Sequence, residues 1–339
     1  MRVWSVLCLA ATIALPISAW ATRAYVSNED GQSVTIIDVE KLEAVATIPV
    51  GKRPRGLKLS NDGSRLYVAV SGLPKCPPSV PDEICAQRKR DLAADGIAVL
   101  DTAQQKVLTT LRAGSDPEQF DITPDGKRMF VANEDSATAS VVDLATGEVI
   151  ERIRVGNEPE GVVVSPNGQW VLVTNEADNT ISIIDTSTLK VLRSISVGRR
   201  PRDVAFTPDS RTVYVGGELD ASIYRVAIPE GQPAERILQL RREALPMTVL
   251  LDPKRERLYV STGRGGTVAV ISLKGGQAKL EMEIPVGTRP WGMDMTADGR
   301  LLFTANGPSN DVTVIDTTKL SVIKKIPVGE TPWGVVVER

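Results

Sequence analysis

A recurring proline in this sequence is flanked by charged and aromatic residues that could bind a ligand or a partner. The proline closes a Gly-x-x-Pro segment, and the residues beside it change from copy to copy. The flanking residues that we single out are Arg53, Arg55, Glu118, Glu160, Arg200, Arg202, Arg289, Trp291 and Trp333. Carboxylates can act as acids, bases or metal ligands, and exposed tryptophan and arginine are frequent at interface hot spots.

The composition excludes several kinds of catalytic site. The chain has no histidine, which rules out a Ser-His-Asp triad, haem attachment through C-x-x-C-H, a His-ligated zinc or copper ion and a histidine base. The run Gly263-Arg264-Gly265-Gly266 lacks the Lys-Ser/Thr of a phosphate loop and is interpreted as a hairpin turn. A net charge of −2 with interspersed signs argues against a nucleic-acid surface. Carboxylates, lysine, tyrosine or a carboxylate-bound calcium remain, without a recognised spacing.

The Gly-x-x-Pro segment recurs with a period of 42 residues, from Gly114 to Gly156 to Gly198 and from Gly287 to Gly329. It opens at Gly51, Gly114, Gly156, Gly198, Gly287 and Gly329, with a degenerate copy near residue 243. Each unit holds four short runs rich in β-branched residues, separated by Gly, Asn, Asp and Pro, which predicts four strands. Four-stranded antiparallel units at this period are typical of the blades of a β-propeller.

The ends of the chain complete the count of blades. After Gly329 only one strand fits, Trp333–Glu338, and three strands precede the first full unit, within residues 24–50. We therefore predict an all-β fold over residues 22–339: a single seven-bladed β-propeller whose C-terminal strand joins the three N-terminal strands. This closure removes free sheet edges. The first full repeat carries an insertion at about residues 72–95.

In such a propeller, the residues beside the proline lie where each inner strand begins, at one mouth of the central channel. Acidic residues fall on blades two and three, arginines on blades one, four and six, and the tryptophans on two neighbouring blades. A second set of loops opens on the same face and adds Glu134, Asp135, Glu176, Asp178, Glu218 and Asp220. The mouth is either a docking face or ligand funnel, or a solvated rim whose charges pair locally for little energy.

Deeper in the inner strands, two more residues depart from the apolar consensus. Lys58 and Asp121 occupy equivalent positions on adjacent blades. An unpaired charge would be costly there, so we expect a structural ion pair between them. A channel-lining site is the alternative.

The N-terminus and the cysteines indicate export. Residues 1–21 combine Arg2, an apolar stretch and a small-x-small site at Ala19-Trp20-Ala21, which predicts a signal peptide and a periplasmic location rather than a membrane anchor. Cys76 and Cys85 lie in the insertion and are expected to form a disulfide. A reactive dithiol is the alternative.

Several segments resemble a known family. Leu66-Tyr67-Val68-Ala69 and Thr313-Val314-Ile315-Asp316 resemble the YVTN family of β-propeller repeats. Asp116-Pro117-Glu118-Gln119-Phe120 and Pro332-Trp333-Gly334-Val335-Val336-Val337 resemble a narrower subgroup, the β-propellers associated with PQQ-dependent alcohol catabolism. The cysteine-containing insertion is not part of that family's repeat. The chain does not resemble the PQQ enzymes themselves, which are larger and carry a vicinal cysteine pair.

The resemblance implies a cellular context more than a mechanism. It implies an exported protein acting beside a quinoprotein dehydrogenase, a c-type cytochrome or a transporter component. We therefore expect a non-catalytic periplasmic binding or scaffold protein that docks such a partner through the charged mouth, without a cofactor of its own. Two alternatives remain open: a small-molecule or cofactor-binding accessory, and a lactonase or hydrolase that uses Glu118, Glu160 and Arg202 around a metal.

Overall fold

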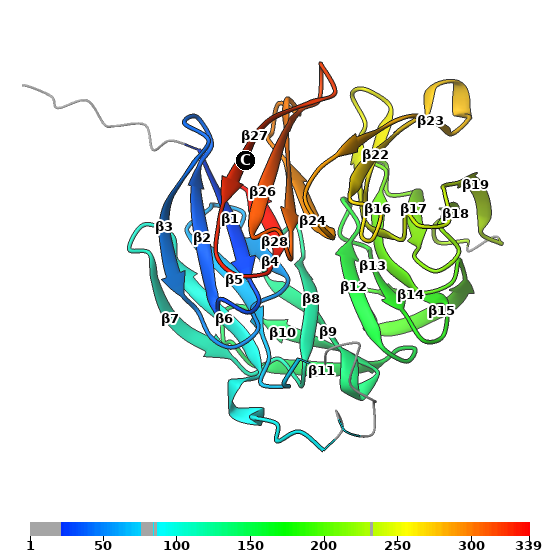
Figure 1. Ribbon diagram of the computed structural model, residues 1–339. Coiled ribbons are helices and arrows are strands. Elements are labelled where there is room, and N and C mark those ends of the chain that lie inside the picture. Colours follow the sequence, from blue (N-terminus) through cyan, green and yellow to red (C-terminus); the bar gives the residue numbers. More distant parts are fainter. Residues whose placement is uncertain (1–21, 76–83, 85–86, 231–232) are drawn as a thin grey trace, which may run out of the picture.

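The apolar runs of each repeat form antiparallel strands in the computed structural model, which describes residues 22–75, 84, 87–230 and 233–339. Seven sheets of four strands each are arranged in a ring (Figure 1). The predicted seven-bladed β-propeller is therefore confirmed. The expected signal peptide and both cysteines, Cys76 and Cys85, lie outside the described residues, so the leader and the disulfide stay predictions.

The strands run from the channel outward in each blade, and the blades are numbered by the order of their inner strands. Blades one and two are β4 (Leu57–Leu59), β5 (Arg65–Val70), β6 (Gly96–Asp101), β7 (Lys106–Leu111), β8 (Pro117–Ile122), β9 (Arg128–Asn133), β10 (Thr138–Asp143) and β11 (Val149–Arg154). Blades three and four are β12 (Pro159–Val164), β13 (Trp170–Asn175), β14 (Thr180–Asp185), β15 (Lys190–Ser196), β16 (Pro201–Phe206), β17 (Thr212–Gly217), β18 (Ser222–Ala227) and β19 (Glu235–Gln239).

The remaining blades follow the same order. Blades five and six are β20 (Pro246–Asp252), β21 (Arg257–Thr262), β22 (Thr267–Ser272), β23 (Lys279–Pro285), β24 (Pro290–Met295), β25 (Leu301–Asn306), β26 (Asp311–Asp316) and β27 (Ser321–Pro327). Blade seven is β28 (Pro332–Val337), β1 (Arg23–Asn28), β2 (Ser33–Asp38) and β3 (Glu43–Pro49). No described helix has the length and apolarity needed to cross a bilayer.

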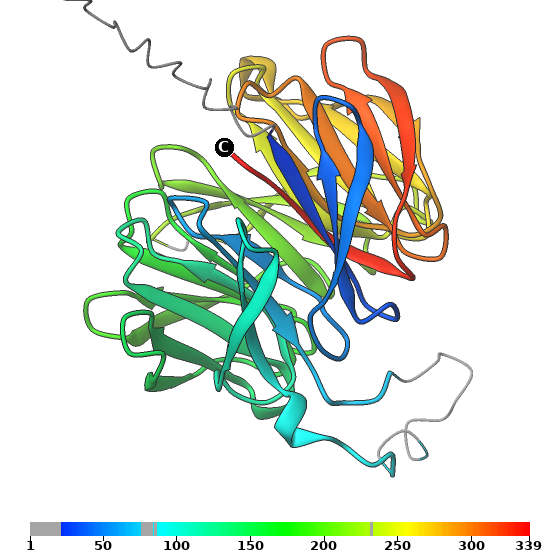
Figure 2. The ribbon, with the colours of Figure 1, turned by 90° about the vertical axis from the view of Figure 1, so that its left-hand side faces the viewer.

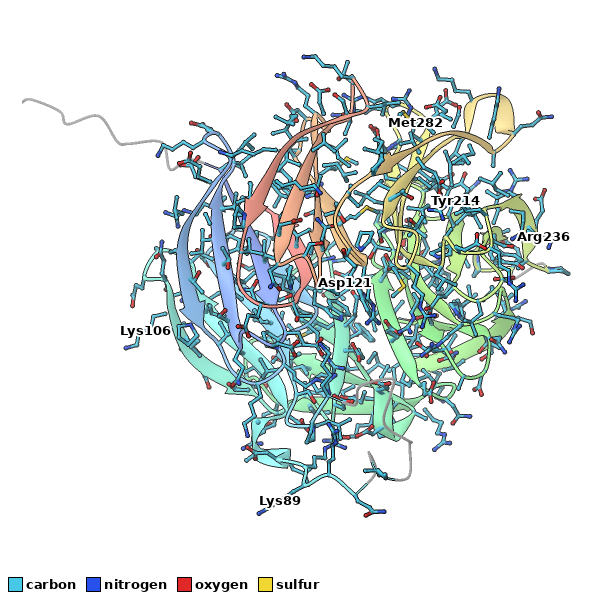
Figure 3. All side chains as sticks on the ribbon, in the orientation of Figure 1. Lys89, Lys106, Asp121, Tyr214, Arg236 and Met282 are labelled. Carbon is cyan, nitrogen blue, oxygen red and sulfur yellow. The ribbon has the colours of Figure 1, made fainter. Side chains whose placement is uncertain are left out.

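The hydrophobic core is divided among the interfaces between blades. One cluster joins Tyr25 and Val34 of blade seven to Leu66 and Val68 of blade one, and each other cluster likewise joins two neighbouring blades. Because both faces of a blade are covered, the middle strands are apolar runs rather than alternating patterns. The outermost strands are largely exposed, as in β3. In Figure 3, Lys106 lies at the periphery and Asp121 near the middle of the ring.

Blade seven closes the ring with strands from both ends of the chain. β28 pairs antiparallel with β1, in a register that sets Ala24 opposite Val337 and Val26 opposite Val335. Figure 2 shows the C-terminal strand in red beside the N-terminal strands in blue. Beyond the strand, Glu338 accepts hydrogen bonds from the Arg23 backbone N–H (2.8 Å) and the Tyr25 hydroxyl (2.9 Å). The predicted closure is confirmed.

Candidate active site at the channel mouth

The residue before each recurring proline turns the chain into the channel. In all seven blades this residue has a positive φ, between 43° and 58°, and none is glycine: Arg53, Asp116, Glu158, Arg200, Leu245, Arg289 and Thr331. This left-handed conformation is uncommon for residues with a side chain and tends to gather at functional sites. In six blades the next two residues begin the inner strand, and in blade one they precede β4, so the turn sets the flanking side chains around the mouth.

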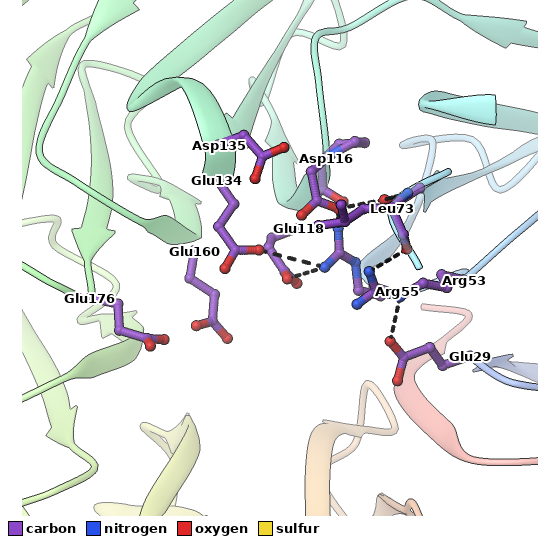
Figure 4. A network of polar contacts seen from close by, with 12 residues as sticks. Glu29, Arg53, Arg55, Leu73, Asp116, Glu118, Glu134, Asp135, Glu160 and Glu176 are labelled. Carbon is purple, nitrogen blue, oxygen red and sulfur yellow. Dashed lines mark hydrogen bonds and ion pairs between the residues drawn. The ribbon is translucent and has the colours of Figure 1, made fainter. Parts of the chain in front are cut away.

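Arg55 is fully buried among acidic residues of the next blade. Its side chain is 1% exposed, and its Nη2 donates to Asp116 Oδ1 (2.5 Å) and to the carbonyl of Pro117 (2.7 Å). Its Nη1 bonds to Glu118 and lies 3.8 Å from Glu134 Oε2. We call these four side chains, Arg55, Asp116, Glu118 and Glu134, the Arg55 cluster. Figure 4 shows them in the mouth, with Glu134 and Glu118 approaching Glu160 of blade three.

A second cluster surrounds Arg202 of blade four. Nη1 of Arg202 bonds to Glu160 and donates to Glu176 Oε2 (2.7 Å), and its Nε donates to Glu218 Oε2 (2.7 Å). Each of these four side chains is 6–11% exposed, so the cluster is largely shielded from solvent. We call Arg202, Glu160, Glu176 and Glu218 the Arg202 cluster.

The mouth holds more carboxylates than arginines, and their pKa values diverge. Burial, together with the charge of Glu176, raises the pKa of Glu160 well above its usual range, against the opposing charge of Arg202. Burial also acts to raise the pKa of Glu176, but its hydrogen bond with Glu160 and the charges of Arg202 and Arg200 outweigh burial and lower it. Burial and the charge of Glu118 raise the pKa of Glu134 to about 9. Neutral pH therefore finds protonated and ionised carboxyls side by side.

The two tryptophans form one platform beside the Arg202 cluster. The ring centroids of Trp291 and Trp333 are 5.3 Å apart, and the guanidinium groups of Arg202 and Arg289 lie 5.6 Å and 4.7 Å from the Trp291 ring. Trp333 is only 5% exposed. Trp333 therefore offers little surface to a partner, whereas Trp291 is half-buried.

The expected division into an acidic and a basic sector is wrong in its geometry. Arg55 of blade one reaches the acids of blade two, and Arg202 of blade four reaches those of blade three. Arg53 and Arg200 are also paired, Arg53 with Glu29 (3.0 Å) and Arg200 with Glu176. Oppositely charged side chains of neighbouring blades form ion pairs, because burying an unpaired charge would cost free energy.

The insertion in the first repeat is fastened across this face. Leu73 accepts a hydrogen bond from Arg53 Nη1 (2.7 Å), and Lys75 lies 3.1 Å from Glu29 of blade seven. On its far side, Arg90 pairs with Asp135 of blade two and with Asp95. The insertion thus joins blades on both sides of blade one.

The channel itself contains a cavity of about 1000 Å³, which no carboxylate of the two clusters lines. Lys58 and Asp121, expected to pair, lie 2.9 Å apart beside it. Asp203 and Asp294 face the same cavity, and each bonds a backbone N–H of the next inner strand, that of Val249 or Val337. Asp121, Asp203 and Asp294 thus fasten neighbouring blades.

Asp203 is the channel residue that the sequence comparison missed. Burial raises its pKa to about 6. Asp203 lies two positions before Ala205, the residue of blade four that corresponds to Lys58 and Asp121. Both positions face the channel, because alternate residues of a strand lie on the same face. A comparison of both channel-facing positions would have found it.

The donor sets do not favour a metal or a haem. Among the described residues no group of three or more acidic or cysteine side chains is arranged to hold a metal ion. The chain has no histidine, and neither cysteine nor tyrosine is among the described residues lining the channel cavity. Since haem iron is usually held by such ligands, the channel does not fit a haem.

Two family models match parts of the chain, and neither covers half of it. The model described as "Cytochrome D1 heme domain" matches residues 90–217. The model described as "Lactonase, 7-bladed beta-propeller" matches residues 188–335, which include Arg202, Glu218, Arg289 and both tryptophans. A curated relative, Antigen Lp49 of Leptospira interrogans, is 28% identical over 111 residues, or 33% of this chain and 23% of that protein. The match therefore spans less than a quarter of the relative.

Solved structures share the fold at low identity. Hydrazine synthase of Kuenenia stuttgartiensis aligns with a TM-score of 0.73 and 21% identity, over 86% of this chain and 92% of the other. A protein named as a "putative 6-phosphogluconolactonase" from Bacteroides fragilis NCTC 9343 aligns with a TM-score of 0.75 and 16% identity, over 96% and 100%. A protein of the same name from Bacteroides uniformis ATCC 8492 gives 0.73 and 18%, over 94% and 100%.

These matches contradict the expected function. A non-catalytic scaffold for PQQ-dependent alcohol oxidation was expected, but the family match and two of the solved structures carry the names of lactonases. None of the matches described here is named for alcohol oxidation or for a scaffold. The names also lean against the expected absence of catalysis.

Proposed function

We propose that this chain is a hydrolase that opens the lactone or ester bond of a small polar molecule at the channel mouth. One observation carries the proposal: Glu160 and Glu176 share a single nitrogen of Arg202, and their pKa values are driven in opposite directions. Two neighbouring carboxyls with separated pKa values can act as an acid and a base at one pH. The lactonase family match covers Arg202 and Glu218 but neither Glu160 nor Glu176, so it supports the class of reaction and not the two carboxyl roles.

The arrangement supplies each proton transfer of hydrolysis. Glu176, ionised, accepts a proton from water as the water oxygen attacks the carbonyl carbon. Nη2 of Arg202, which bonds to no acceptor among the described residues, can stabilise the oxyanion. Glu160, protonated, then donates its proton to the leaving oxygen as the carbon–oxygen bond breaks. The proton on Glu176 returns to Glu160 through their hydrogen bond, and the product is a hydroxy acid.

Substitution of the two carboxylates tests this function. Glu160→Gln and Glu176→Gln should each lower kcat/KM for lactone hydrolysis by about a hundredfold or more, the usual contribution of a general acid or base. Hydrolysis is followed by proton release with glucono-δ-lactone, glucono-γ-lactone, the anionic glucaro-γ-lactone, γ-butyrolactone and a nitrophenyl ester. Glu158→Gln is the matched control, because Glu158 lies two positions away, exposed and outside both clusters.

Two results would overturn the proposal. The first is a wild-type chain that hydrolyses none of these substrates above the rate in buffer. The second is full activity in both glutamine variants when their unfolding midpoints match that of the wild type.

A further inference from the structure

We propose that a groove between blades five and six binds an oxyanion, a carboxylate or a phosphate group, carried by the substrate of the mouth. The groove has a volume of about 610 Å³, and its charged lining residues are all basic: Arg264, Arg289 and Lys325. Arg264 lies in the turn between β21 and β22, Arg289 precedes β24, and Lys325 lies on β27. The inference concerns the substrate class and in that respect rests on the proposed function.

The positive charge of this groove is not neutralised by the described residues. Arg53, Arg55, Arg200 and Arg202 of the same face all have carboxylate partners, whereas none of the three groove residues forms an ion pair within the described chain. Lys325 Nζ donates to the carbonyl of Val286 at 3.1 Å, which leaves its charge uncompensated.

Nearby carboxylates do not neutralise the positive charge of the groove. Glu283 of β23 is held by Arg241 at 2.8 Å, and Arg241 Nη2 also donates to the carbonyl of Gly265 in the neighbouring turn. Burial and the charge of Arg202 lower the pKa of Arg289, as expected for a cation without a counter-ion. An oxyanion in the groove would supply that counter-ion.

The groove also presents groups that suit an oxyanion. Thr288 and Ser309 add hydroxyl groups to the lining, and the Ser309 hydroxyl accepts the Thr288 backbone N–H at 2.5 Å, which leaves its own hydrogen to donate. Gly266 and Gly287 line the wall without side chains. Arginine adds a planar set of donors that matches carboxylate and phosphate oxygens.

The groove and the Arg202 cluster are connected through the Trp291 ring, which one arginine of each approaches. Arg289 lines the groove and also lies 4.7 Å from the Trp291 ring, and Arg202 lies 5.6 Å from the same ring. A small molecule can therefore reach Arg202 with its carbonyl while an anionic substituent lies beside Arg289. The geometry points to an anionic lactone or ester as substrate.

Direct binding tests the groove without any assay of hydrolysis. Inorganic phosphate and, separately, acetate are titrated into the full chain by calorimetry at constant ionic strength. We expect at least one of them to bind, and Arg264→Gln combined with Lys325→Gln to weaken that binding tenfold or more. Arg199→Gln is the control, because it removes an exposed cation of the same face that does not line the groove. Absence of binding by both anions, or equal binding by the double variant, would overturn the inference.

Kinetics then test the link to the substrate. Glucono-γ-lactone and glucaro-γ-lactone differ by one carboxylate, and wild type should have the lower KM for the second. Arg264→Gln should raise the ratio of the second KM to the first about tenfold, and Arg199→Gln should not. An unchanged ratio in Arg264→Gln overturns the inference even if both lactones are hydrolysed. Anion binding without hydrolysis of any lactone overturns the proposed function and leaves the anion site standing.

Discussion

At the scale of residues, the mouth derives its chemistry from carboxyls that share cations. Glu160 and Glu176 meet at one nitrogen of Arg202, and Glu118 and Glu134 both approach Nη1 of Arg55. Two carboxyls at such a site cannot both ionise at their ordinary pKa, so one keeps its proton. Perturbed pKa values of this kind gather at functional sites more often than elsewhere.

The paired carboxyls predict a bell-shaped dependence of hydrolysis on pH. Glu176 must be ionised to act as the base, and its lowered pKa keeps it ionised except in acid. Glu160 must be protonated to act as the acid, and its raised pKa keeps it protonated until the pH is well above 4.5. We expect kcat/KM to fall at low pH as Glu176 gains a proton and at high pH as Glu160 loses one. A rate that rises steadily with pH to the alkaline limit, as in simple hydroxide catalysis, would contradict this assignment.

Arg55 predicts a large effect on stability. Among the described residues, Arg55 is the one arginine that bonds to Asp116 and Glu118, and replacing it by methionine leaves these two buried carboxyls without their arginine partner. Breaking a buried pair in this way costs about 3–5 kcal/mol of unfolding free energy. Urea denaturation followed by tryptophan fluorescence measures the loss. Arg53→Met is the comparison; its pair with Glu29 is more exposed, and we expect a loss of about 1 kcal/mol or less.

At the scale of elements, β28 has the greatest influence on the ring. It pairs with β1 along its length, and Val335 and Val337 pack against Phe303 and Ala305 of blade six. All its residues except the partly exposed Val336 are buried. Without it, β1 would present an unpaired edge of the kind that templates aggregation.

Ending the chain after Gly329 tests this element. Burial of Trp333, Val335 and Val337 would be lost, at about 1.5–3 kcal/mol for each side chain. The sum is comparable to the whole stability of a typical domain, about 5–15 kcal/mol. We expect the shortened chain to lose its cooperative thermal transition in circular dichroism, and a peptide of residues 329–339 to restore it. A shortened chain that melts at the wild-type temperature would contradict this role.

At the scale of the whole molecule, the fold was predictable and the contacts of the site were not. The repeat predicts strands and turns because both are set by neighbours within one unit, and it predicts the blade count because the units and the strands at the two ends can be counted along the chain. The partners of Arg55 and Arg202 lie on adjacent blades, and nothing within one repeat says whether a side chain turns toward the preceding blade or the following one. The ion pairs of Arg55 and Arg202 were therefore visible only in the structure.

Local departures were hidden for the same reason. The inner strand of blade one is short, Leu57–Leu59, and the Gly56 N–H before it donates to the carbonyl of Glu118 of blade two at 3.1 Å. Asp203 was missed because its register differs from that of Asp121 and Asp294. Both features depend on how two blades meet, and the comparison of repeats predicted such a contact only where opposite charges occupy equivalent positions, as Lys58 and Asp121 do.

The closure of blade seven has a consequence for the kinetics of folding. Six blades join strands that are close in sequence and can form as local units, but the bond from Arg23 to Glu338 spans 315 positions. Contacts at such separation are slow to form, because the entropy of closing the intervening loop must be overcome first. The search that brings the two ends together should therefore set the folding rate. In a circular permutant, with the present ends joined and a new opening between two other blades, the slow long-range contact would form at the new opening. The final seven-bladed ring would be the same.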